Sequence, residues 1–255
     1  MTYHEFKGKT AIFTGAASGM GLLCSQCYAA EGGNVLMVDV NEEALRKEAN
    51  AINAKGVGKA VACVADIRKY DEVCAVRDLA VQTFGSIDLL ISFAGGTAVR
   101  CCSVDRTAYP EFPDVPIDVY EWGLDVNLKG PFYFAHACLK QMREQKSGVI
   151  INIGSVTGAE GDPYGLDYPT AKSALMNGFT KSLAQYGAAY GIRVNCVSPG
   201  PVLTRAAMAK MQTPLGRAAE PQEIIDLVLY LASDKAAFIT GANYMIDGGR
   251  SIMKK

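Results

Sequence analysis

Seven short, almost continuous apolar runs alternate with longer amphipathic stretches, and this alternation restricts the fold more than any other feature of the sequence. The runs cover residues 10–14, 34–38, 59–64, 87–92, 149–153, 192–197 and 242–246. Strands of a parallel sheet that is covered on both faces have this character. The segments between them, among them 42–55, 71–84 and 170–190, are long enough for crossover helices. The pattern therefore predicts an α/β fold with a doubly wound parallel sheet.

The composition predicts one domain over residues 1–255 that handles small molecules. Of the 255 residues, 49% are hydrophobic, which is enough for one large core. Lys and Arg total 25 against 26 Asp and Glu, so no field exists that would attract nucleic acid or an anionic membrane. No apolar segment approaches the roughly 18 residues of a membrane span. We expect a small-molecule substrate and neither a nucleic-acid nor a membrane partner.

The eight cysteines are scattered, which favours reduced thiols in a cytoplasmic protein over a disulfide framework. Residues 1–6 lack the apolar core of a secretory signal, which favours the same location. Cys24 and Cys27 have the spacing of a redox pair or half a zinc site, but on a helix such positions share one packed face. With two histidines and no second such pair, we expect core packing and no metal site. Cys101 and Cys102 are interpreted as loop packing, and a redox role of either pair is left open.

Residues 95–117 form the longest irregular stretch of the sequence. It contains adjacent glycines at its start and prolines at 110, 113 and 116. A loop of this length in a compact domain is usually functional. We expect it to form a wall or rim of the substrate site.

A glycine-rich segment, TGAASGMG at residues 14–21, follows the first apolar run and opens the first helix. Glycines let the backbone approach a pyrophosphate, and a helix N-terminus supplies amide donors and partial positive charge. The spacing differs from the common GxGxxG fingerprint, and such a turn alone also suits an ordinary tight bend. The residues expected to bind a dinucleotide here are Gly15, Ser18, Gly19, Met20 and Gly21.

Asp39 ends the second apolar run, about twenty residues beyond this turn, where a carboxylate accepts hydrogen bonds from the adenosine ribose. A carboxylate there repels a 2′-phosphate, and Ala16, Ala17 and Ser18 offer no cation to bind one. We therefore expect NAD rather than NADP, with Asp39 and the adjacent Val40 at the adenosine. The alternative is a solvated acid at a strand end.

Tyr168 and Lys172 lie four residues apart, one above the other on a helix face that Pro169 requires to begin close to Tyr168. A free tyrosine titrates near pH 10. Positive charge nearby, from Lys172 and from an oxidised nicotinamide, lowers that pKa, so we expect Tyr168 to act as general acid and base. Ser155, thirteen residues earlier, follows a strand and can orient a substrate oxygen. A surface helix pair and a strand-end turn serine are the alternatives.

Together these residues resemble the classical short-chain dehydrogenase/reductase family, and the resemblance extends from Thr14 to Gly249. It implies a Rossmann fold with Tyr168 as the general acid and base and Lys172 as the group that lowers its pKa and holds the ribose. Ser155 would bind the substrate oxygen, and Asn127 would anchor a proton-relay water. Without the resemblance, Asn127 would be interpreted as a helix-capping amide.

The resemblance also implies further cofactor contacts. Asp66 and Ile67 would lie beside the adenine, and Ala94 and Gly95 would flank the cofactor. Four residues of one turn would contact the nicotinamide, namely Pro199, Gly200, Val202 and Thr204. The segment 203–216 resembles the family's variable substrate lid.

Two positions depart from the family pattern. Ser92 and Phe93 replace two asparagines that help to fix the central strand, which leaves open how this region is held. Gly154 replaces the serine often found before the catalytic one. Neither change removes a reacting group.

The function implied is an NAD-dependent oxidoreductase that interconverts a secondary alcohol and a ketone, in a direction that the sequence leaves open. The alternatives are an NAD(P)H-dependent reductase of a steroid or 3-oxoacyl ketone and a non-enzymatic dinucleotide-sensing protein, which would not need the full catalytic set. The resemblance further implies a homotetramer assembled through helices near 118–145 and 168–190.

Candidate substrate positions lie at 96–102, 156–164 and 203–211. They mix apolar side chains (Val156, Leu203, Met208, Met211) with polar ones (Arg100, Thr157, Glu160, Asp162, Arg205). Several polar groups favour a substrate with paired hydrogen bonds, and we expect a sugar, a sugar acid or a polyol.

Overall fold

The strands form one sheet in the predicted class. The computed structural model describes residues 3–105 and 107–253. Its strands are β1 (Thr10–Thr14), β2 (Asn34–Asp39), β3 (Lys59–Val64), β4 (Leu89–Ser92), β5 (Gly148–Ile153), β6 (Ile192–Pro199) and β7 (Asn243–Ile246). All neighbours are parallel, in the order β3-β2-β1-β4-β5-β6-β7. The strand order reverses between β1 and β4, as in a doubly wound sheet, so the predicted fold is confirmed.

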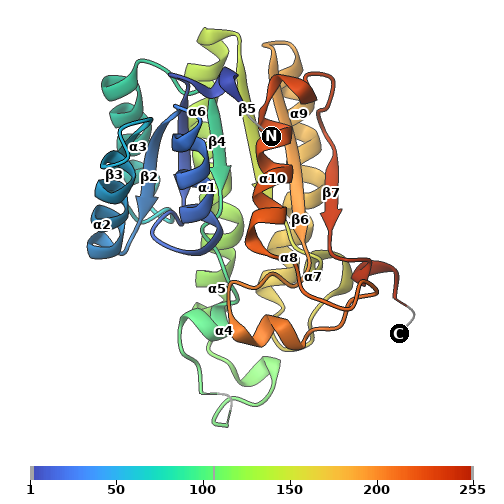
Figure 1. Ribbon diagram of the computed structural model, residues 1–255. Coiled ribbons are helices and arrows are strands. Elements are labelled where there is room, and N and C mark those ends of the chain that lie inside the picture. The colour runs from blue at the N-terminus through green and yellow to red at the C-terminus, as the bar shows by residue number, and fades with distance from the viewer. Residues whose placement is uncertain (1–2, 106, 254–255) are drawn as a thin grey trace.

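Helices cover both faces of this sheet (Figure 1). On one face lie α1 (Gly19–Ala30), α2 (Glu42–Asn53) and α10 (Pro221–Ala232). On the other lie α3 (Tyr70–Phe84), α6 (Gly130–Gln145) and α9 (Thr180–Ala188). Beyond the strand ends lie α4 (Ala98–Cys101), α5 (Ile117–Leu124), α7 (Thr157–Glu160) and α8 (Asp167–Ala174).

Each face of the sheet has its own apolar core. Phe13 of β1 packs with Tyr28 of α1 in the first core, and its neighbour Ile12 packs with Phe134 of α6 in the second. Successive residues of a strand point to opposite faces, so both must be apolar when both faces are covered. This is why the strands read as continuous apolar runs rather than as alternating ones.

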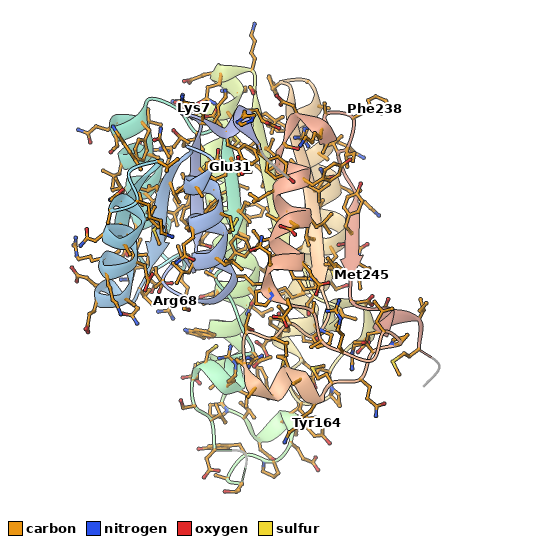
Figure 2. All side chains as sticks on the ribbon, in the orientation of Figure 1. Lys7, Glu31, Arg68, Tyr164, Phe238 and Met245 are labelled. Carbon is orange, nitrogen blue, oxygen red and sulfur yellow. The ribbon has the colours of Figure 1, made fainter. Side chains whose placement is uncertain are left out.

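The carboxyl ends of the strands point toward a lobe built from α4, α5, α7 and α8 (Figure 1). Figure 2 labels Arg68 at the end of the sheet near β3, and Tyr164 in this lobe. Ligands of open α/β sheets bind outside the carboxyl ends, at the point where strand order reverses. The fold therefore predicts a ligand site at the carboxyl ends of the strands, beside the lobe.

Two segments differ from the sequence-based prediction. The helix expected over 170–190 is divided into α8, a π-helical turn at Leu175–Phe179 and α9. At this turn the Thr180 hydroxyl donates to the Leu175 carbonyl at 2.6 Å and accepts from the Asn152 amide at 2.9 Å, which ties the turn to β5. The stretch 95–117, in which residue 106 lies outside the described residues, is not irregular throughout, because it contains α4 and a 3₁₀ turn at Phe112–Asp114.

All eight cysteines are free thiols. Cys24 is buried in the first core and Cys27 packs against it, as predicted. The interpretation of Cys101 and Cys102 as packed residues is wrong, because both are exposed at the end of the short α4. Within residues 3–105 and 107–253, no helix is long and apolar enough to cross a membrane and no cluster of metal-ligating side chains occurs.

Candidate functional site

The turn between β1 and α1 is built around its glycines. Gly15 and Gly19 have φ of +66° and +56°, which L side chains rarely adopt. A Cβ on Gly21 would lie 2.2 Å from the Gly15 carbonyl oxygen, so the helix contacts the turn directly. Ser18 caps α1 without a side-chain hydrogen bond, and the first amides of the helix are left for another acceptor.

A cleft of about 520 Å³ lies beside this turn. It is lined by the predicted cofactor residues Gly15, Ser18, Gly19, Met20, Gly21, Asp39, Val40, Asp66, Ile67, Ala94, Gly95 and Thr204. Arg68, Trp122 and Val126 also line it, although no sequence signal identified them. The glycine cradle, the open helix amides and Asp39 fit a nicotinamide dinucleotide in this part, which we call the cofactor half.

The acids of the cofactor half are held in defined positions. Asp39 accepts from the backbone amides of Ala17 at 3.1 Å and Asn41 at 3.0 Å, which ties its carboxylate to the glycine-rich turn. Asp66 is paired with the Arg68 guanidinium at 2.6 Å, and this hydrogen bond lowers the pKa of Asp66. The charge of Arg68 is thus balanced within the chain.

A second part of the cleft, of about 330 Å³, holds the predicted chemical groups. It is lined by Ser155, Tyr168, Lys172, Pro199, Gly200, Val202 and Thr204. Met20, Phe93 and Gly95 line both parts, so the two are continuous. We call this part the substrate half.

Tyr168 lies in the first turn of α8, which begins at Asp167 as Pro169 requires. Its hydroxyl is hydrogen-bonded to the Ser155 side chain, which itself accepts from the Thr157 amide at 3.2 Å. Burial raises the pKa of Tyr168 above its ordinary value, and the Ser155 bond lowers it to a smaller extent. Positive charges of the chain, those of Arg205 and Arg100, also lower this pKa, but desolvation of the phenol is the larger effect, so the net shift is opposite to the one expected from nearby charge.

Lys172 lies beside the phenol, one helical turn later. Its Nζ donates to the Ile153 carbonyl at 2.8 Å and lies 5.5 Å from the centroid of the Tyr168 ring. The side chain is 3% exposed, and burial lowers its pKa from 10.5 to about 8. Burial therefore destabilises the charged ammonium of Lys172 relative to its neutral amine.

This depressed pKa predicts a pH-dependent difference in stability between wild type and Lys172→Met. Between pH 8 and 10.5 the unfolded chain holds the Lys172 proton more tightly than the folded chain does, so stability rises with pH in that window. Urea unfolding at pH 7 and pH 10.5 should therefore show the wild type gaining about 3 kcal/mol relative to the variant at the higher pH. If the difference in unfolding free energy between wild type and variant were the same at both pH values, the lowered pKa of Lys172 would be contradicted.

Asn127 lies in a π-helical turn at Asp125–Lys129 and lines neither half of the cleft. Its amide donates to the carbonyls of Gly96 at 2.8 Å and Gly123 at 2.9 Å. Its side-chain oxygen accepts from the Gly96 amide at 3.0 Å. The side chain therefore holds the Gly96 loop in place, and the proton-relay role implied by the resemblance stays a prediction.

The structure explains both departures from the family pattern. The segment after β4 is held by Thr14, whose hydroxyl accepts from the Ala94 amide at 3.1 Å, and by the edge-on contact of Phe93 with Phe13. A Cβ on Gly154 would lie 2.2 Å from the Ser198 hydroxyl, so no space exists there for a serine side chain.

Most of the candidate substrate positions line the substrate half: Arg100, Val156, Thr157, Asp162, Arg205, Met208 and Met211. Two do not. Leu203 is exposed outside it, and Glu160 is paired with Arg250 of the C-terminal segment at 3.1 Å. The segments 95–117 and 203–216 thus each contribute a wall, as expected.

Comparisons with known proteins find similar chains over nearly the whole sequence. A family model described as enoyl-(acyl carrier protein) reductase matches residues 15–251. Trans-4-hydroxycyclohexanecarboxylate dehydrogenase of Sinomonas cyclohexanicum is 38% identical, over 95% of this chain and 93% of that protein.

Two solved structures have a similar fold. A 3-oxoacyl-[acyl-carrier protein] reductase with bound NAD from Brucella melitensis is 30% identical, covers 98% of this chain and 94% of its own, and has a TM-score of 0.85. An NAD⁺-bound xylitol dehydrogenase is 29% identical, covers 96% of this chain and 100% of its own, and also has a TM-score of 0.85.

Proposed function

The chain belongs to the short-chain dehydrogenase/reductase family, whose members act on CH–OH groups, and from this premise we propose that it moves a hydride between NAD and a secondary alcohol or ketone. The observation that carries the proposal is the buried Tyr168 hydroxyl, bonded to Ser155 and beside Lys172, in the half of the cleft that continues from the glycine cradle.

The two halves of the cleft would bind different groups, the cofactor half the dinucleotide and the substrate half the alcohol or ketone. Bound NAD would supply the hydride acceptor. Gly15, Gly19 and the first amides of α1 would hold its pyrophosphate, and Thr204 and the preceding turn would hold the nicotinamide end. The substrate half then brings the carbinol carbon against that end and excludes water from it.

The proton moves through Tyr168. In oxidation the phenolate takes the proton of the substrate hydroxyl, and in reduction the phenol returns it to the developing alkoxide. Ser155 donates to the substrate oxygen and fixes its distance from the phenol. Lys172, whose Nζ lies 5.5 Å from the centroid of the phenol ring, would place positive charge beside the phenolate when it is protonated.

Asp39 predicts a clear preference for NAD over NADP. Its carboxylate is fixed by two backbone amides in the cofactor half, where a 2′-phosphate would meet a like charge. The ratio of kcat/KM with NAD to that with NADP should exceed about tenfold, and Asp39→Ser should reduce this ratio. Equal or better kcat/KM of the wild type with NADP would show this assignment to be wrong.

We propose a small, hydroxylated substrate such as a sugar acid, a sugar or a polyol. The substrate half is at the lower end of the size range of ligand pockets and combines methionines with Thr157, Asp162 and two arginines. Relatives named for a hydroxycyclohexanecarboxylate and for xylitol have substrates of this size. A spectrophotometric screen of NAD reduction with sugar acids, polyols, steroids and simple secondary alcohols tests this; activity confined to steroids would refute it.

Reduction of a 3-oxoacyl chain is the second candidate, favoured by the likeness to the Brucella reductase with bound NAD. The near-neutral charge balance of this chain favours it less, because an acyl carrier protein is acidic and docks on a basic face. Steady-state oxidation of NADH with a 3-oxoacyl thioester distinguishes the two candidates.

A homotetramer is part of the proposal. Phe132 of α6 is 50% exposed and stacks on Phe179, and Tyr186 of α9 is 45% exposed, so the two helices carry aromatic rings on their outer sides. Burial of such rings between copies is favourable. Light scattering should give about four times the 27.2 kDa chain mass, and a monomer mass would reject the assembly. We place the enzyme in the cytosol, where its eight free thiols stay reduced.

A further inference from the structure

The substrate half of the cleft carries positive charge that the chain does not balance. Arg100, Arg205 and Lys172 line it, against one acid, Asp162. Among the ion pairs of the described residues, none includes Arg100 or Arg205. The third arginine of the cleft, Arg68, differs in being paired with an acid of the chain.

Arg100 is directed into the cleft by the backbone beneath it. A Cβ on Gly96 would lie 2.3 Å from Nη2 of Arg100, so the guanidinium occupies the space that this glycine leaves free. Gly96 is held in turn by both polar ends of the Asn127 side chain. The position of the guanidinium therefore follows from a fixed piece of backbone rather than from a mobile loop tip.

Arg205 lines the same half of the cleft from another segment, directly after Thr204. Its one side-chain hydrogen bond among the described residues goes to the Met208 sulfur at 3.7 Å, a weak acceptor. Both arginines act on the Tyr168 phenol and oppose the rise in its pKa. The two charges are thus close enough to the reacting hydroxyl to change its pKa. They come from two different segments of the chain.

We propose that the substrate is a hydroxy carboxylate whose carboxylate binds between the guanidinium groups of Arg100 and Arg205 while its hydroxyl meets Tyr168 and Ser155. The inference rests on the proposed function and selects an acid from the substrate classes given there. Guanidinium groups bind carboxylates through two parallel, charge-assisted hydrogen bonds. A neutral polyol would offer neither of these exposed guanidinium groups a charged partner.

The cofactor pyrophosphate is the other anion that these arginines can reach, because both also line the cofactor half. The positions of the two arginines favour the substrate carboxylate over the pyrophosphate as their partner. The cradle for a pyrophosphate lies at Gly15–Gly21, whereas Arg100 lies on Gly96 and Arg205 beside Met208, at the end of the cleft that holds Tyr168.

Binding to the NADH-loaded protein tests the inference without requiring turnover. The probes are 4-hydroxycyclohexanecarboxylate and gluconate, each compared with a neutral counterpart, the primary amide of the first and glucitol for the second. Calorimetry on the Tyr168→Phe protein should give at least one acid a Kd about tenfold or more below that of its neutral counterpart. Arg100→Leu and Arg205→Leu should each remove this difference and leave the Kd of NADH within twofold. Arg46→Leu, an exposed arginine of α2, is the matched control and should change neither constant.

Two results would overturn the inference. One is the absence of any preference for the acids, with or without turnover. The other is a rise in the Kd of NADH in the Arg100 and Arg205 variants with the preference for the acids unchanged, which would assign the guanidinium groups to the cofactor pyrophosphate. Failure of the proposed function looks different, because it is seen as turnover that survives in Tyr168→Phe.

Discussion

Tyr168→Phe should lower kcat/KM by about 10³-fold or more while the Kd of NADH changes less than threefold. General acid–base catalysis contributes rate factors of this size, and neither of the two polar groups beside the phenol can replace it. The Ser155 hydroxyl is a far weaker acid, and the Lys172 ammonium is directed to the Ile153 carbonyl. Removing the hydroxyl leaves the aromatic ring and the shape of the cleft in place, so cofactor binding should persist.

The measurement pairs steady-state kinetics with a fluorescence titration of NADH. Tyr164→Phe is the matched control, because Tyr164 lies four residues earlier in the same segment, is exposed and does not line the cleft. The control should have wild-type kinetics. Turnover of Tyr168→Phe within threefold of wild type would count against the assignment of Tyr168.

Gly21→Ala should raise the Kd of NADH by about 100-fold or more and lower the stability of the fold. The added Cβ would lie 2.2 Å from the Gly15 carbonyl oxygen and 3.2 Å from that of Thr14, so α1 or the turn must move. Overpacking of this kind costs about 1 to 3 kcal/mol, and the displaced turn is the one that would hold the pyrophosphate.

Gly178→Ala is the matched control for this substitution. Gly178 is also helical, but a Cβ there would meet nothing within 4 Å. Its Kd for NADH should equal that of the wild type. Wild-type NADH affinity in Gly21→Ala would mean that the glycine-rich turn does not hold the cofactor.

The fold could be predicted from the sequence because both faces of the sheet are covered. Each strand had to be apolar on both sides, so the apolar runs at 10–14 and 59–64 coincide with β1 and β3, and the other strands differ by one or two residues. Pro169 fixed the start of α8 in the same direct way. The π-helical turns left no sequence signal, because they depend on tertiary contacts such as that of Asn152 with Thr180.

Site residues could be predicted from the sequence where a residue type in that position has few structural roles. They were harder to predict where the surrounding structure determines the pKa or the contacts of the side chain. Gly15, Asp39 and Tyr168 lie in the cleft as expected. The pKa of Tyr168 was predicted in the wrong direction, since the spacing to Lys172 does not reveal how deeply the phenol is buried. The engagement of the Asn127 side chain with backbone groups likewise depends on a loop that is distant in sequence.

The fate of the carbinol hydrogen tests the central claim most directly. A secondary alcohol that supports turnover is labelled with deuterium at the carbinol carbon and incubated with NAD and the enzyme, and the NADH formed is analysed by mass spectrometry. Hydride transfer with Tyr168 as the proton acceptor predicts one deuterium in each NADH from the wild type and an initial rate of labelled NADH formation that is about 10³-fold lower with Tyr168→Phe. Unlabelled NADH, or an equal rate of labelled NADH formation by the variant, would contradict the account.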